Sequence, residues 1–93
     1  MIDPAARTVA RRGRAIDLTA KEFAIVEYLA RRQGEVVSKA DVLEHAWDFA
    51  YDGDPNVIEV HISNIRRKLD RPFGANGLRT VRGSGYRLVP DGR

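Results

Sequence analysis

The sequence contains no cysteine, and this absence excludes several kinds of protein at once. A disulfide framework, a thiolate metal site and a cysteine nucleophile are all impossible, so packing of the core must supply the stability. Long apolar runs are missing too. The N-terminal stretch has no run of signal-peptide length, and no later run is long enough to span a membrane. We therefore expect a cytoplasmic protein with no membrane partner.

Motifs that carry catalysis are also lacking. The sequence has no HExxH motif and no Walker loop, and its RGSG tetrapeptide, residues 82–85, lacks the spacing and the downstream helix of a phosphate-binding turn. The two histidines, His45 and His61, fall on different expected helices, without carboxylates at metal-ligand spacing. We expect no enzymatic activity, no metal and no cofactor.

The sequence is long enough for one domain, and its charge is unevenly distributed. Its 93 residues are 43% hydrophobic, which fits a single folded domain over residues 1–93. Residues 1–55 carry eight Lys and Arg against ten Asp and Glu, whereas residues 56–93 carry eight against three. The basic C-terminal part favours a polyanionic partner such as nucleic acid, although a solvated basic surface would look similar.

Turn and cap signals divide the chain into a sheet, three helices and a hairpin. Two β-prone pieces, Thr8–Ala10 and Ala15–Leu18, flank an RRGR turn and predict an N-terminal antiparallel sheet over about residues 3–18. Thr19 and Glu22 form a capping-box pattern that begins the first helix. Its apolar stripe is Phe23, Val26, Leu29 and Ala30, and Gly34 supplies a stop.

Two more helices and a hairpin follow. Ser38 and Asp41 repeat the capping pattern for a second helix that ends near Trp47. Asp54 and Pro55 are suited to start a third helix, which runs to about Leu69 and completes a helical region over residues 20–69. Two β-prone segments, Leu78 to Val81 and Tyr86 to Val89, then predict a hairpin over residues 78–89, which makes the fold class α+β.

The third helix has an unusual outer face. At 100° per residue, Ile58, Ile62, Ile65 and Leu69 share a narrow arc that we assign to the core. The opposite side carries Val60 and several polar residues, among them Ser and Asn, which are poor helix formers. Such side chains suit base edges and thymine methyl groups in a major groove. An ordinary surface helix is the alternative. The residues of this outer face are Asn56, Val60, Ser63, Asn64 and Arg67.

Arg82 lies at the tip of the expected hairpin, beside two glycines. Glycines allow a tip to approach another molecule closely, and an arginine there is suited to the narrow minor groove, where negative potential is concentrated. Its partner is then outside the chain. Alternatively, Arg82 is a solvated loop residue.

Three segments together resemble the winged-helix effector domain of OmpR/PhoB-type response regulators, bacterial two-component transcription factors. The first two helices are similar in LTAKEFAIVEYLARRQGEVVSKADVLEHAWD, the recognition helix in NVIEVHISNIRRKLD, and the wing in LRTVRGSGYRLV. The resemblance covers nearly the whole chain. It implies a winged helix-turn-helix with a four-stranded N-terminal sheet, three helices and a C-terminal β-hairpin wing, which binds double-stranded DNA sequence-specifically.

The resemblance and the helical pattern together give an expected DNA interface, with the third helix in the major groove and the wing in the minor groove. For the major groove we expect Val57, Val60, His61, Ser63, Asn64 and Arg67. For phosphates we expect Trp47, Asn56, Arg66, Lys68, Thr80 and Tyr86, and for the minor groove Arg82.

The resemblance also implies partners. The loop Asp48–Asp54 resembles the segment that touches RNA polymerase, although a solvated acidic loop fits equally well. A histidine kinase would act only through a receiver domain, which this chain lacks, and tandem dimers on DNA are implied. Ser63 and Asn64 stand where some members carry arginine, so base preference cannot be copied. The main alternative is a winged helix that contacts only proteins.

Overall fold

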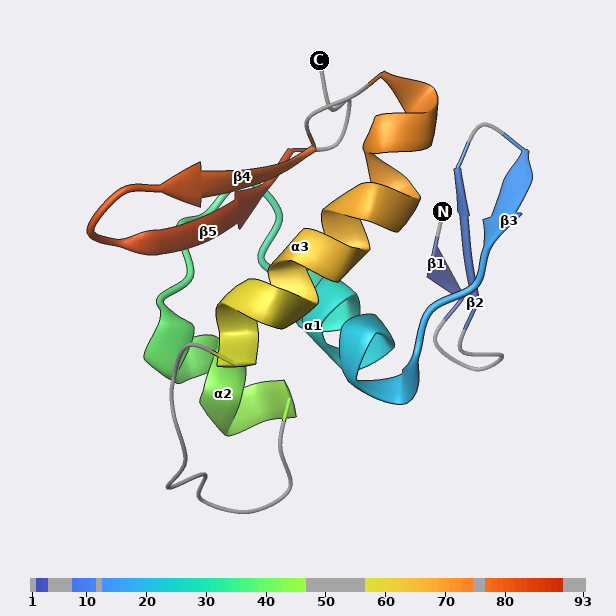
Figure 1. Cartoon of the computed structure of the whole chain (residues 1–93). Coiled ribbons are helices and arrows are strands. Elements are labelled where there is room, and N and C mark those ends of the chain that lie inside the picture. The colour runs from blue at the N-terminus through green and yellow to red at the C-terminus, as the bar shows by residue number, and fades with distance from the viewer. Residues whose placement is uncertain (1, 4–7, 12, 47–56, 75–76, 90–93) are drawn as a thin grey trace.

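The computed structural model describes residues 2–3, 8–11, 13–46, 57–74 and 77–89. Three helices lie between an N-terminal antiparallel sheet and a C-terminal hairpin (Figure 1), as the α+β prediction requires. In chain order the elements are β1 (Ile2–Asp3), β2 (Thr8–Arg11), β3 (Arg14–Ile16), α1 (Ala20–Arg31), α2 (Lys39–Ala46), α3 (Val57–Leu69), the short 3-10 helix η1 (Arg71–Phe73), β4 (Leu78–Val81) and β5 (Gly85–Leu88).

The N-terminal sheet has three strands in the order β1-β2-β3 where the structure describes it. The resemblance implied four strands, so the described part of this sheet is smaller than expected. Val9 pairs with Ile16 in the register of β2 and β3 and is buried. The second predicted strand also ends earlier than expected, because β3 stops at Ile16 and Asp17 and Leu18 lead into the cap of α1.

The capping box at the start of α1 is confirmed. The Thr19 hydroxyl accepts a hydrogen bond from the Glu22 amide at 3.2 Å, and the Glu22 carboxylate accepts one from the Thr19 amide at 3.0 Å. These two bonds satisfy two amides that a helix start otherwise leaves without partners. At α2, the Ser38 hydroxyl likewise accepts from the Asp41 amide at 3.1 Å. The predicted starts of both helices are therefore correct.

The core is built on the inner face of α3. Its four predicted core residues, Ile58, Ile62, Ile65 and Leu69, are all buried. In α1 the prediction was incomplete, because Ile25 is fully buried although it lies off the expected stripe, while Ala30 is only half-buried. The reason is that α1 packs against both α2 and α3, so it buries a wider face than one partner would require.

The C-terminal hairpin packs against the helices through both of its strands. Thr80 pairs with Tyr86 and Leu78 with Leu88, close to the predicted register, although β5 begins at Gly85 and ends at Leu88. Val37, in the α1–α2 connection, exchanges two backbone hydrogen bonds with Tyr86, of 2.7 and 2.8 Å. Beyond these contacts, the hairpin extends away from the helices (Figure 1).

Two predicted helix ends fall outside the described residues. The proposed start of the third helix at Asp54 and Pro55 and the proposed end of the second at Trp47 both lie there; as described, α2 ends at Ala46 and α3 begins at Val57. Among the helices that the structure describes, none has the length and apolar character that crossing a bilayer would require.

Candidate nucleic-acid interface

The outer face of α3 is free of the core. Val60 is 60% exposed, and Ser63 and Arg67 are exposed, whereas Asn64 is partly so. An exposed β-branched apolar side chain between poor helix formers contributes little to the stability of an isolated domain. This face is therefore exposed to solvent, and its side chains carry hydrogen-bonding groups.

On one flank of α3, Val57 and His61 make contacts within the domain. Val57 is half-buried and packs against the core. The ring of His61 donates from Nδ1–H to the Val57 carbonyl at 2.9 Å, since a carbonyl can only accept. The bond fixes the ring against its own helix and leaves Nε2 directed elsewhere. These two residues therefore lie at the edge of the exposed face.

Arg66 and Lys68 have partners inside the domain. Arg66 donates from Nε to the Leu78 carbonyl at 2.8 Å and from an Nη group to the Thr80 hydroxyl at 2.6 Å. Lys68 donates to the Glu22 carboxylate at 2.6 Å. Both cations were expected at phosphates from their positions in the sequence. The sequence pattern gave no sign of these contacts, because the partners lie 12 to 46 residues away.

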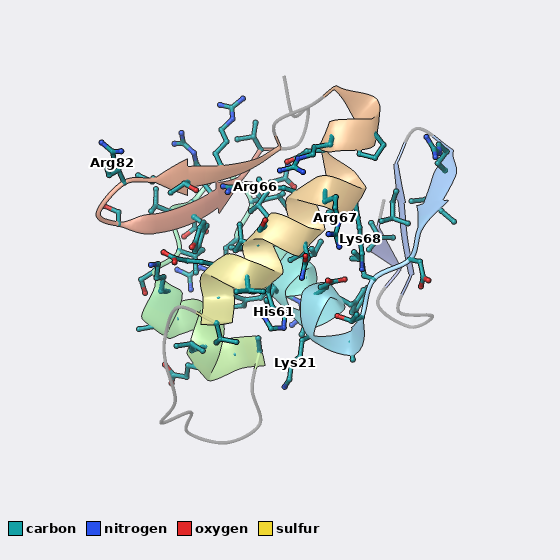
Figure 2. The ribbon with its side chains drawn as sticks, in the orientation of Figure 1. Lys21, His61, Arg66, Arg67, Lys68 and Arg82 are labelled. Carbon is teal, nitrogen blue, oxygen red and sulfur yellow. The ribbon has the colours of Figure 1, made fainter. Side chains whose placement is uncertain are left out.

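Arg82 occupies the tip of the wing, as expected. It is exposed, and Figure 2 shows it at the far end of the hairpin, away from the helices. The turn is closed by the Ser84 amide, which donates to the Val81 carbonyl at 2.9 Å, and Gly83 adopts φ 78° within it. A positive φ is inexpensive only for glycine, so the sequence favours this tight tip.

Tyr86 is largely committed to the core. It was expected to contact phosphate, but only 3% of it is exposed and it belongs to the hydrophobic core. Burial raises the pKa of its hydroxyl. The tyrosine therefore stabilises the wing against the helices, and because it also lines the groove beside the wing, its contact with phosphate stays a prediction.

A groove of about 550 Å³ lies between the start of α2 and the wing, and α3 reaches it through Glu59 in its first turn. Its walls include Lys39 of α2, Glu59 of α3, and Thr80, Arg82 and Ser84 of the wing. Lys39 and Glu59 form an ion pair beside it, with 2.7 Å between Nζ and Oε1, and the hydrogen bond to Glu59 raises the pKa of Lys39. Sequence reasoning did not select Lys39 or Glu59. Among the described residues that line it, Glu59 is the one contributed by α3.

Several expected residues cannot be placed. Trp47, Asn56 and the loop Asp48–Asp54 lie outside the described residues. In the described part of the chain, no group of three or more His, Asp or Glu side chains is placed to hold a metal. His45 stacks on Tyr28, with ring centroids 4.1 Å apart, which gives this histidine a packing role.

The family model described as "Transcriptional regulatory protein, C terminal" matches residues 13–88. The chain belongs to this family. It is 46% identical over 91 residues to the transcriptional regulatory protein TcrA of Mycobacterium tuberculosis, a match that covers 98% of this chain and 36% of TcrA. This chain therefore corresponds to about a third of that regulator's length.

Solved structures identify the type of transcriptional regulatory domain. The DNA-binding domain of the response regulator AdeR, in complex with an intercistronic region, superposes with a TM-score of 0.87 at 26% identity, over 96% of this chain and 92% of that one. The OmpR/PhoB homologue DrrB of Thermotoga maritima gives 0.81 at 33%, over 96% and 41%. The fold is thus the winged helix of OmpR/PhoB-type response regulators, as the sequence predicted.

Proposed function

We propose that this domain binds double-stranded DNA sequence-specifically, with the outer face of α3 in the major groove and Arg82 in the adjacent minor groove. Val60, Ser63, Asn64 and Arg67 are the principal reading residues, and His61 and Val57 contribute from the edge. Family membership and the AdeR complex support the general activity. The assignment of grooves rests on the geometry of this chain.

The observation that carries the proposal is the groove between the wing and the starts of α2 and α3. In a duplex, one sugar-phosphate strand always separates a major groove from the neighbouring minor groove. A protein that reads both must therefore leave a channel for that strand between its two reading elements. Here the channel has the starts of α2 and α3, with Lys39 and Glu59, on one side and the tip with Arg82 on the other.

Binding to a random duplex pool, followed by sequencing, tests the proposal and returns the binding site. The affinity for the selected duplex should then fall as salt rises, with a slope in log–log form of about 0.9 per phosphate contact. A winged helix that contacts only proteins would select no sequence and would show no such slope. The two candidate functions are therefore separated by one titration.

Other roles follow from the family as parts of the same proposal. We propose that the intact regulator is cytoplasmic, receives phosphate from a histidine kinase on a separate receiver domain, and binds DNA as a tandem dimer. We also propose that the segment Asp48–Asp54 contacts RNA polymerase. Within this proposal the domain has no enzymatic activity of its own, and its output is occupancy of DNA.

A further inference from the structure

Arg66 joins the helix proposed to read the major groove to the wing proposed to read the minor groove. It projects from α3 toward β4 (Figure 2) and makes two hydrogen bonds there, to the Leu78 carbonyl and to the Thr80 hydroxyl. One of its donors is Nε and the other an Nη nitrogen, so the planar guanidinium is held at two points. Two bonds from a rigid planar group fix an orientation as well as a distance.

The position of these bonds along the wing matters more than their number. Asp70, just after α3, accepts hydrogen bonds from the amides of Gly77 and Leu78 at 3.0 and 3.2 Å and holds the base of β4. Thr80 is two residues before Arg82, so its bond to Arg66 is the tie from α3 that lies nearest the tip among the described hydrogen bonds. Without this bond, the described hydrogen bonds that join the wing to α3 and Asp70 would all lie at the base of β4, at Gly77 and Leu78.

On this basis we propose that Arg66 is a positioning residue, which sets the spacing between α3 and Arg82 so that both grooves are read by one rigid unit. The proposal rests on the DNA-binding function proposed above. It differs from the role expected from the sequence, in which Arg66 is a ligand of phosphate. A pre-positioned tip binds more tightly because the entropy of ordering it has already been lost on folding.

The first arm of the test uses the free protein and needs no DNA. Backbone ¹⁵N relaxation at Gly83 and Ser84 should show a rigid tip in the wild type and increased motion in Arg66→Met and in Thr80→Val. Order parameters of roughly 0.85 are expected to fall toward about 0.6. Thr80→Val changes no charge and nearly preserves shape, so it isolates the bond. Unchanged order parameters in both variants would overturn the proposal.

The second arm is a double-mutant cycle with Arg82→Ala on the selected duplex. If Arg66 acts by positioning Arg82, Arg66→Met should weaken binding about tenfold when Arg82 is present and less than about twofold when it is absent. Thr80→Val should show the same dependence on Arg82. Equal losses in both backgrounds, with the salt slope reduced by about 0.9 in each, would make Arg66 a phosphate ligand and would overturn positioning.

Arg67→Met is the matched control, because it removes the same charge from the neighbouring residue, which is exposed on α3. Its loss of affinity should be the same with or without Arg82. If the wild-type domain selected no duplex, the proposed DNA-binding function would fail. The relaxation arm would still report whether Arg66 orders the tip, so the two failures can be told apart.

Discussion

Glu22 at the start of α1 and Lys68 at the end of α3 form an ion pair, with 2.6 Å between Oε1 and Nζ. Glu22 is only 3% exposed, and the same carboxylate oxygen accepts the Thr19 amide of the capping box. Burial acts to raise the pKa of Glu22, but the bonds from Lys68 and Thr19 outweigh it, and the pKa is lowered. One carboxylate therefore caps a helix and ties α1 to α3.

This pair predicts how stability responds to acid. Because the pKa of Glu22 is lower in the folded state than its ordinary value of 4.5, its contribution is complete above that value and is lost as pH falls through the folded pKa. Glu22→Gln should lower the free energy of unfolding by about 1 to 3 kcal/mol at neutral pH. In urea unfolding between about pH 3 and 7, the free energy of unfolding of Glu22→Gln should decline less toward acid than that of the wild type.

Lys68→Met is the companion variant. It leaves the buried carboxylate with its cap but without its counter-ion, so stability at neutral pH should also fall. If Lys68 were instead free to bind phosphate, as the sequence suggested, the variant would leave stability unchanged and reduce the salt slope of DNA binding by about 0.9. If the free energy of unfolding fell equally toward acid in the wild type and in Glu22→Gln, this would contradict the lowered pKa of Glu22.

Gly85 predicts a different kind of sensitivity. A Cβ at this position would lie 2.0 Å from the Val37 carbonyl oxygen, and φ is +139°, so both contact and conformation exclude a side chain. Gly85→Ala should destabilise the domain by roughly 3 to 5 kcal/mol. Gly83→Ala is the control: it also has a positive φ but meets nothing within 4 Å, so it should cost only about 1 to 2 kcal/mol. Thermal unfolding of both variants measures the difference, and equal losses would refute the close-approach argument.

Local patterns were sufficient to predict most of the fold. The Thr19 capping box, the buried stripe of α3 and the turn at Gly83 each lie within a single element or turn of the chain, and all three are confirmed. Ile25 was missed because its burial depends on how α1 meets two other helices. Helical periodicity describes one element at a time and cannot show this.

The candidate site was less predictable than the fold. The sequence places Val60, Ser63 and Arg67 on the outer face of α3, and the structure leaves them exposed. The partners of Arg66 and Lys68, in contrast, come from distant parts of the chain. A long cation on a helix flank looks the same in sequence whether it pairs with phosphate or with the protein. Only the tertiary structure distinguishes these two cases.

Asn64 offers a test that separates reading of DNA from stability. If its amide makes a bidentate contact with a base, Asn64→Ala should cost about 1 to 3 kcal/mol of discrimination at one position of the selected site. Alanine is also the better helix former, so the free energy of unfolding should stay the same or rise slightly. Repeating the selection with the variant, alongside urea unfolding, measures both quantities. Unchanged base preference would remove Asn64 from the reading residues.

Arg82 provides the most direct test of the minor-groove assignment. Arg82→Ala should weaken binding roughly ten- to a hundredfold where an A·T-rich flank narrows the minor groove, because negative potential is concentrated there. Where the flank is G·C-rich the loss should be much smaller. Arg82→Lys keeps the charge but hydrates more strongly, so it should recover only part of the affinity at the A·T-rich flank. Fluorescence anisotropy with two duplexes that differ only in the flank measures all three proteins. Equal losses on both duplexes would show that Arg82 contributes charge without reading the width of the groove.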